Sequence, residues 1–166
     1  MGIRASELIA VIAFMTDMSP ESTLLHSWRV ALLSEKIASL VLPDHVDDIF
    51  YAGLLHDIGN VGASKPIAHY LSIHEQIDDP YICSHTTRAS NFLESLQGIS
   101  TIANFIKFHH ERIDGTGYPF GATSTVIPLG SQILALADTL DLAGTFNSFR
   151  NFKLCHTNLS SQTPSS

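Results

Sequence analysis

The residues from His109 to Pro119 read His-His-Glu-Arg-Ile-Asp-Gly-Thr-Gly-Tyr-Pro, a histidine pair followed by a charged, glycine-rich segment. Upstream, His56 and Asp57 end another apolar run. Histidine and aspartate side chains that become buried must find polar partners. Imidazole and carboxylate groups together are suitable ligands for zinc, iron, manganese or nickel. The pattern therefore predicts a metal site built inside a helical bundle.

Helical periodicity places further polar side chains on apolar faces. Residues three or four positions apart share one face of a helix, and five predicted helical segments carry a histidine or an aspartate along their apolar stripe. One such histidine is more often a satisfied core residue than a ligand, but five segments together favour a shared site of the kind built in bundle cores. The residues concerned are His26, His56, His85, His109 with His110, and Asp138 with Asp141. We expect the remaining histidines at the surface, namely His45, His69, His74 and His156.

Composition bounds the class of protein. The chain has 166 residues, of which 45% are apolar, which suits one domain with a sizeable core. No apolar run approaches the roughly 18 residues of a membrane-spanning helix, and no secretory signal is evident. The net charge of −7 disfavours binding to a nucleic-acid polymer. Cys83 and Cys155 match no zinc or redox spacing. We therefore expect a cytoplasmic protein with reduced thiols and no membrane partner.

The organisation of the chain is that of helices joined by short loops. No stretch alternates with the period of a strand, so the sequence predicts an all-α fold. Asp79 followed by Pro80 marks a helix start. Residues 111–128 form a long loop, and a loop of this length in a small domain is usually functional. Residues 145–166 are rich in Ser, Thr and Asn, so we expect a helical domain over 1–144 and a disordered tail over 145–166.

Taken in order, these motifs resemble the HD-GYP domain, a branch of the HD-domain metal-dependent phosphohydrolases. The resemblance covers roughly residues 20–144, and its most specific part is the segment from His109 to Pro119. The matching motifs are His26-Ser27-x-Arg29-Val30-Ala31, His56-Asp57-Ile58-Gly59, His85, His109-His110-Glu111-Arg112-x-Asp114-Gly115-x-Gly117-Tyr118-Pro119-x-Gly121, Ile127-Pro128-Leu129 and Ala137-Asp138-x-x-Asp141.

The resemblance implies an HD-domain helical bundle that holds two or three divalent transition-metal ions in its core. Iron or manganese are expected first, and zinc or nickel are also compatible. The implied activity is hydrolysis of the bacterial messenger cyclic di-GMP to pGpG or GMP. One metal would be held by His26, His56, Asp57 and Asp138, and the other by His85, His109 and His110, with Asp57 bridging them. His56 and Asp57 would be the catalytic residues. The substrate would meet Asn60, Lys65, Arg112, Asp114, Gly115, Gly117, Tyr118 and Pro119.

The residue types suit this chemistry. Two metals about 3.5–4 Å apart acidify a water and neutralise charge on a phosphodiester. A bridging carboxylate such as Asp57 would fix their separation, and neutral imidazoles leave the centre positive enough for an anionic substrate. Glycines let a loop backbone approach a ligand closely. The ring of Tyr118 offers a face for a guanine.

Three departures from the family pattern keep alternatives open. The family usually has a lysine where this chain has Asn60, which brings no charge to a phosphate. Ser22 stands where some members carry a glutamate for a third metal, so we expect two metals. The segment after Gly144 matches the family poorly, which indicates a truncated or degenerate member.

Two other functions therefore stand beside the first. One is a degenerate, non-catalytic module that binds cyclic di-GMP or a protein partner. The other is a general HD phosphohydrolase that acts on nucleotides, which the Gly-Tyr-Pro loop opposes. The same loop is a candidate surface for protein partners. In a truncated member, exposed apolar surface would favour a homodimer.

Overall fold

The computed structural model describes residues 5–16, 25–64, 67, 70 and 72–159. Within these residues the fold is all-α, as predicted, and the β-structure is limited to an isolated bridge between Asp114 and Thr123. The helices are α1 (Ala5–Thr16), α2 (His26–Val41), η1 (Pro43–His45), α3 (Val46–Leu55), η2 (Ile58–Asn60), α4 (Ile73–Asp78), α5 (Pro80–Cys83), α6 (His85–Glu94), α7 (Ser100–Lys107) and α8 (Leu129–Leu159).

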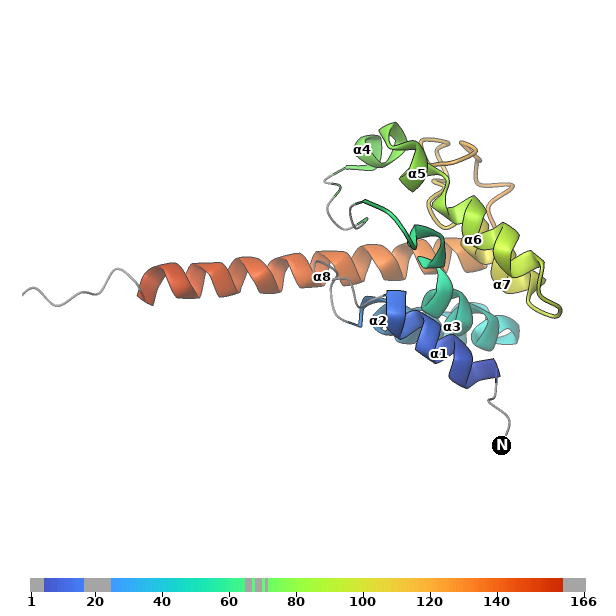
Figure 1. The fold of residues 1–166 in the computed structure, drawn as a ribbon, viewed down its shortest axis with the longest axis horizontal. Helices are drawn as coiled ribbons and strands as arrows, with labels where there is room; N and C mark the ends of the chain where they lie inside the picture. The colour runs from blue at the N-terminus through green and yellow to red at the C-terminus, as the bar shows by residue number, and fades with distance from the viewer. Residues whose placement is uncertain (1–4, 17–24, 65–66, 68–69, 71, 160–166) are drawn as a thin grey trace, which may run out of the picture.

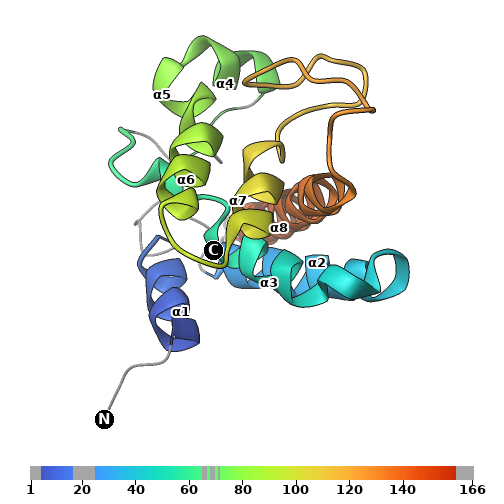
Figure 2. The same cartoon turned by 90° about the vertical axis from the view of Figure 1, so that its right-hand side faces the viewer.

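The helices pack around the N-terminal part of α8. Figure 1 shows this part of α8 between the α2–α3 pair on one side and the α6–α7 pair on the other, with α1 against α3. Seen along α8 in Figure 2, the loop that joins α7 to α8 lies beside α4. Segments that are far apart in the sequence are thereby brought to one centre.

Small residues allow α2 and α3 to cross at very short range. A Cβ atom added to Gly53 of α3 would lie 2.5 Å from the Cα atom of Ala31 in α2, closer than two carbon atoms can approach. Ala31 and Ala52 are fully buried at this crossing. The close approach brings His26, at the start of α2, to His56, at the end of α3, with 5.2 Å between the ring centroids.

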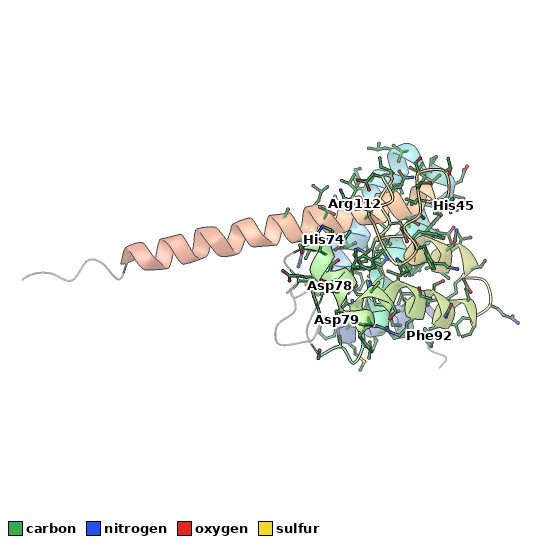
Figure 3. All side chains as sticks on the ribbon, turned by 90° about the horizontal axis from the view of Figure 1, so that it is seen from above. His45, His74, Asp78, Asp79, Phe92 and Arg112 are labelled. Carbon is green, nitrogen blue, oxygen red and sulfur yellow. The ribbon has the colours of Figure 1, made fainter. Side chains whose placement is uncertain are left out.

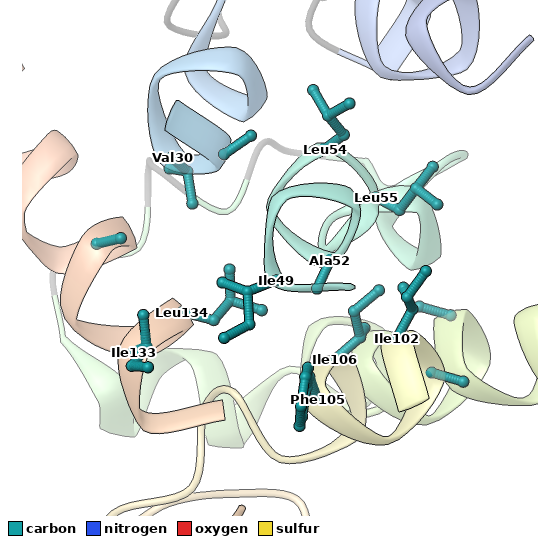
Figure 4. Packing of buried hydrophobic residues seen from close by; sticks show 14 of the residues in the cluster. Val30, Ile49, Ala52, Leu54, Leu55, Ile102, Phe105, Ile106, Ile133 and Leu134 are labelled. Carbon is teal, nitrogen blue, oxygen red and sulfur yellow. The ribbon is translucent and has the colours of Figure 1, made fainter. Parts of the chain in front are cut away.

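The hydrophobic core lies where α2, α3, α7 and α8 meet. Figure 4 shows Val30, Ile49, Ile106 and Leu134 packed around the α3 helix, and all four side chains are fully buried. Each comes from a different helix, so burial of their apolar surface holds the four helices together. The hydroxyl of Ser131 donates to the Phe105 carbonyl at 2.8 Å and ties α8 to α7.

The C-terminal segment differs from the expectation. Residues 145–159 were expected to lack regular structure, but α8 continues through them to Leu159, and Figure 1 shows this part extending from the body. Between Gly144 and Pro164 the chain has neither glycine nor proline, so each residue added to the helix gains a backbone hydrogen bond without a helix breaker. Residues 160–166 lie outside the described residues, and the domain boundary at 144 stays a prediction.

Among the described residues, no helix combines the length and the apolar character needed to cross a bilayer.

Candidate metal centre

The predicted histidines lie at helix ends rather than along helix faces. His26 and His85 are the first residues of α2 and α6, His56 directly follows α3, and His109 and His110 follow the end of α7. The apolar periodicity therefore identified the right helices and placed His56, His109 and His110 at their ends, but it placed His26 and His85 within them. Periodicity locates a face, and it does not locate the residue at which a helix begins.

A helix end also orients the imidazoles. The last carbonyls of a helix have no intrahelical partner, and such carbonyls accept hydrogen bonds from histidine three residues later. Nδ1 of His56 lies 2.8 Å from the Gly53 oxygen, Nδ1 of His85 lies 2.6 Å from the Ile82 oxygen, and Nδ1 of His109 lies 2.6 Å from the Ile106 oxygen. Because a carbonyl only accepts, Nδ1 carries the proton and Nε2 presents a lone pair.

His26 is oriented by a side chain instead. Its Nδ1 lies 2.8 Å from Oδ2 of Asp141, and Arg29 donates to the same carboxylate at 2.5 and 2.9 Å. Its Nε2 lies 3.3 Å from Oδ1 of Asp138. Asp141 was noted on the apolar face of its helix but was not assigned to the site. The signal that could have found it is its position one turn after Asp138, which places both carboxylates on one helix face.

The structure brings the seven predicted ligands together in two groups. The mixed group consists of His26, His56 and Asp57 with Asp138, and the all-histidine group consists of His85, His109 and His110. In each of the triads His26–His56–Asp57 and His85–His109–His110, the candidate ligand atoms lie within 4.8 Å of one another.

Asp57 lies between the two groups. Its Oδ2 is 3.4 Å from Nε2 of His56 and 3.9 Å from Nε2 of His26. Its Oδ1 is 3.7 Å from Nε2 of His85. One oxygen therefore faces each group, which is the arrangement that a bridging carboxylate requires.

The donor set fits two metal ions. Nε2 of four imidazoles is buried without a hydrogen-bond partner among the described residues: His56, His85, His109 and His110. Each buried polar atom left unpaired costs on the order of 1–3 kcal/mol, so four converging lone pairs need a common explanation. Divalent metal ions would satisfy all four, because the second nitrogens of His56, His85 and His109 are already held by carbonyls.

The two groups differ in charge. Burial and the neighbouring imidazoles lower the pKa of His85 and His110 and lower the pKa of His109 to about 3, so the all-histidine group is neutral at pH 7. Burial opposes charge on His26 as well, but hydrogen bonds to Asp138 and Asp141 outweigh it and raise the pKa of His26 to about 10. Burial likewise opposes charge on Asp57, yet the surrounding histidines lower its pKa to about 2.

The loop after the histidine pair packs back onto it. Gly117 lies so close to the His110–Arg112 backbone that an added Cβ would be 2.3 Å from the Arg112 nitrogen. The Tyr118 amide donates to the His110 oxygen at 3.1 Å, and the Tyr118 ring stacks on the His110 ring with centroids 4.8 Å apart.

Tyr118 is therefore enclosed. Its side chain is 2% exposed, and its hydroxyl donates to Oε1 of Gln76 in α4 at 3.0 Å. The expected open ring face for a guanine is not present, because His110 covers one face. In this structure Tyr118 supports His110, a predicted ligand in the all-histidine group.

The remaining loop residues divide between structure and surface. Glu111, which the site prediction omitted, is buried and accepts hydrogen bonds from the Phe120 and Ala122 amides at 2.6 and 2.7 Å. Gly115 has a φ of +78°, a value that favours glycine. The side chains of Arg112 and Asp114 are 58% and 56% exposed, and Nε of Arg112 lies 3.9 Å from Oδ1 of Asp114. Pro119 follows a cis peptide bond.

Of the two predicted substrate contacts Asn60 and Lys65, only Asn60 lies among the described residues. Nδ2 of Asn60 donates to Oδ1 of Asp57 at 2.9 Å, so this side chain lies at the centre. Lys65 lies outside the described residues. The histidines expected at the surface include His45, with a 42% exposed side chain, and His74, and both are labelled in Figure 3. His69 and the side chain of His156 are not described.

Arg88 of α6 holds the turn that carries Asp57 beside the start of α6. Its guanidinium donates to the Gly59 oxygen at 2.8 and 3.1 Å and to the Tyr81 oxygen at 2.6 Å. A Cβ atom on Gly59 would lie 2.0 Å from the His85 oxygen, so only glycine permits this contact. The turn that carries Asp57 is thus pressed against the start of α6, which carries His85.

Comparison with known proteins finds phosphodiesterases among the proteins to which this chain is similar. A phosphodiesterase of Vibrio cholerae named as specific for 3'3'-cGAMP is 30% identical over 145 residues, which cover 86% of this chain and 32% of that protein. A cyclic di-GMP phosphodiesterase of Pseudomonas aeruginosa is 35% identical over 140 residues, which cover 81% of this chain and 33% of that protein. The chain thus spans about a third of the length of these relatives.

Solved structures show the same fold. A cyclic GMP-AMP-specific phosphodiesterase of Vibrio cholerae superposes with a TM-score of 0.68 at 20% identity, over 88% of this chain and 42% of that one. An HDGYP protein of Bdellovibrio bacteriovorus superposes with a TM-score of 0.55 at 16% identity, over 87% of this chain and 44% of that one. The family model described as HD domain matches residues 10–150. The resemblance deduced from the motifs is confirmed, and the chain belongs to the HD domain family.

Proposed function

We propose that this chain is a metal-dependent phosphodiesterase that hydrolyses cyclic di-GMP to pGpG or GMP. The observation that carries the proposal is the convergence of four buried, unpartnered imidazole nitrogens around Asp57. The names of the relatives from Vibrio cholerae and Pseudomonas aeruginosa support a cyclic dinucleotide as the class of substrate. We expect the activity in the cytoplasm, where this messenger acts.

The proposed ligands divide the work between two positions. Iron or manganese bound there would activate a water and neutralise charge on the phosphodiester, as two-metal sites do. Asp57 would bridge the two positions, since one of its oxygens faces each group. His26, His56 and Asp138 would complete one position, and the remaining three histidines would complete the other.

Substrate would approach from the side of the mixed group. The side chains of Asp57 and Asp138 are 14% and 10% exposed, whereas those of His85 and His109 are 0% and 1% exposed. A phosphate therefore has access at the two carboxylates, whereas the Nε2 atoms of His85, His109 and His110 are buried. Exposed Arg112 is the proposed contact for an outer phosphate oxygen.

The base preference is a separate part of the proposal. Cyclic di-GMP is the first candidate, and 3'3'-cGAMP is the second because several matched relatives bear that specificity in their names. Both contain guanine, so we expect slower hydrolysis of cyclic di-AMP. Since Tyr118 is enclosed, the guanine contact falls to exposed residues of the loop such as Asp114, whose carboxylate can accept from the guanine N–H groups.

A second candidate function is binding of the dinucleotide without turnover. Asn60 favours it, because an amide that is engaged by Asp57 supplies no positive charge to a phosphate or a leaving group. In this case the chain would act as a receptor, and protein partners would bind its dinucleotide-bound form.

The test is a turnover assay on protein reconstituted anaerobically with iron or with manganese. Cyclic di-GMP, 3'3'-cGAMP, cyclic di-AMP and a 5′-mononucleotide are compared at equal concentration. We expect hydrolysis of the guanine-containing dinucleotides, its loss in His85→Ala, and wild-type rates in the surface control His74→Ala. Binding without product under either metal would replace the enzyme with the receptor. A faster rate on the mononucleotide would replace it with a general phosphohydrolase.

A further inference from the structure

Asn60 contacts the one carboxylate that the two groups share. Its Nδ2 donates at 2.9 Å to Oδ1 of Asp57. That oxygen is the one that faces His85, while Oδ2 faces His56 and His26. The amide therefore holds the half of Asp57 that would reach the all-histidine group.

The orientation of the amide follows from its partner. An ionised carboxylate only accepts hydrogen bonds, so the nitrogen end of Asn60 must face Asp57. The oxygen end is buried and has no hydrogen-bond partner among the described residues. The contact with Asp57 is thus the interaction that fixes this side chain.

The backbone around Asn60 is fixed independently. The backbone N–H of Asn60 donates to the backbone carbonyl oxygen of Asp57 at 2.8 Å, and the backbone carbonyl oxygen of Asn60 accepts from the Ala63 N–H at 2.9 Å. The neighbouring Gly59 is held by Arg88 and pressed against His85. A change confined to the Asn60 side chain therefore leaves the turn in place and removes only the donor.

The donor has a specific effect on a bridge. Rotation of a carboxylate about its last bond is broad and weakly restrained, yet a bridge needs each oxygen to point at its own group. A carboxylate oxygen can accept more than one interaction, so Oδ1 can keep the amide while it faces the all-histidine group. A neutral amide also adds no positive charge that would compete with a metal.

We propose that Asn60 is a positioning residue that holds Asp57 as a bridge between the two groups, in place of the phosphate contact expected from the sequence. The proposal rests on the metal centre of the proposed function. In this proposal the neutral amide at position 60 stabilises the geometry of the centre and does not contact a phosphate.

The test measures metal binding rather than turnover. Asn60→Leu removes the donor at similar size, Asn60→Ala removes it without new bulk, and Asn104→Ala on the exposed side of α7 is the matched control. Stepwise manganese affinities are measured by competition with a chelator, and magnetic coupling between the two ions by electron paramagnetic resonance. A hydrogen bond from an outer residue to a metal-binding side chain is worth roughly 10–100-fold in metal affinity.

We expect both Asn60 variants to bind the second ion about 10–100-fold more weakly and to lose the magnetic coupling. The first affinity and the melting temperature of the metal-free protein should match those of the control. Wild-type affinities and wild-type coupling in both variants would overturn the proposal. An equal loss of both affinities together with a lowered melting temperature would also overturn it, because that is the result of a general structural role. Absence of turnover in the wild type would overturn the enzyme alone, since these measurements do not depend on product.

Discussion

The two ligand groups are held in place by different means. In the all-histidine group, His85 and His109 are oriented by backbone carbonyls and His110 by the Tyr118 ring. In the mixed group, His56 is likewise oriented by a backbone carbonyl, that of Gly53, but His26 is oriented by the carboxylate of Asp141. The histidines of the first group are neutral and their Nε2 atoms are buried, whereas the second group is charged and its carboxylates are partly exposed. If the two groups bind metal ions as proposed, the all-histidine group already has its lone pairs in place, whereas the mixed group must first release a proton from His26.

The largest effect is expected from a substitution that removes the carboxylate between the two groups. Asp57→Ala takes away the residue that faces both, so we expect the metal content to fall from about two ions per chain to fewer than one. Elemental analysis of anaerobically reconstituted protein measures this. Asp47→Ala on the exposed side of α3 is the control and should keep both ions. If Asp57→Ala retained one ion at wild-type affinity, the groups would be independent.

Opposite dependence on pH is the second expectation, for the metal-free protein. His85, His109 and His110 have pKa values below the ordinary 6.5, so the stability that depends on them is complete above pH 6.5 and is lost as the pH falls. His26 has a pKa of about 10, so its contribution is complete below pH 6.5 and is lost as the pH rises through 10. Each titrating group contributes at most about 1.4 kcal/mol per pH unit.

Urea denaturation of the metal-free protein between pH 5 and pH 9 measures both limbs. We expect His26→Gln to flatten the alkaline limb and to leave the acid limb in place, while the exposed control His74→Gln changes neither. An alkaline limb that persists in His26→Gln would show that His26 does not hold the extra proton.

The third expectation concerns Asp141. Asp141→Asn keeps an acceptor for Nδ1 of His26 but removes the charge, so the affinity of the mixed group should fall by about 10–100-fold with no change at the all-histidine group. Asp48→Asn is a close control, because Asp48 makes the same kind of contact with His45 at 2.9 Å on the surface. Stepwise manganese titration separates the two affinities, and equal weakening of both would contradict the comparison.

The smallest expected effect is at Tyr118. Tyr118→Phe keeps the ring on His110 and loses only the hydrogen bond to Gln76, which is worth about 1 kcal/mol of stability. We expect metal affinities within about threefold of wild type. Tyr118→Ala should weaken the all-histidine group well beyond that. Identical affinities in the two variants would mean that the stacked ring does not hold His110.

The sequence predicted the all-α fold and the residues that meet at the centre. The order of histidine and aspartate residues along the chain can be recognised without knowledge of the geometry, because few residue types can bind a metal ion. The helix starts at His26 and His85 were not predicted, because apolar periodicity shows the face of a helix and not its first residue. The extension of α8 to Leu159 was missed for a related reason, since composition suggested a tail where no residue breaks the helix.

Contacts between distant segments were the harder part. Asn60 was placed at a phosphate because of what the family has there, while its contact with Asp57 depends on the rotation of one side chain. The burial of Tyr118 depends on α4, more than forty positions away, whose Gln76 receives its hydroxyl. Neither contact leaves a periodic signal in the sequence.

The carbonyl partners of His56, His85 and His109 bear on mutational tolerance. Because Gly53, Ile82 and Ile106 contribute backbone oxygens, no exchange of a side chain can delete these acceptors. Their positions can be lost only through movement of the main chain. Gly53 is therefore the vulnerable member of the three, since any side chain there would push α3 away from Ala31 and carry His56 with it. At Ile82 and Ile106, by contrast, exchanges among apolar side chains of similar volume should leave the imidazoles in register.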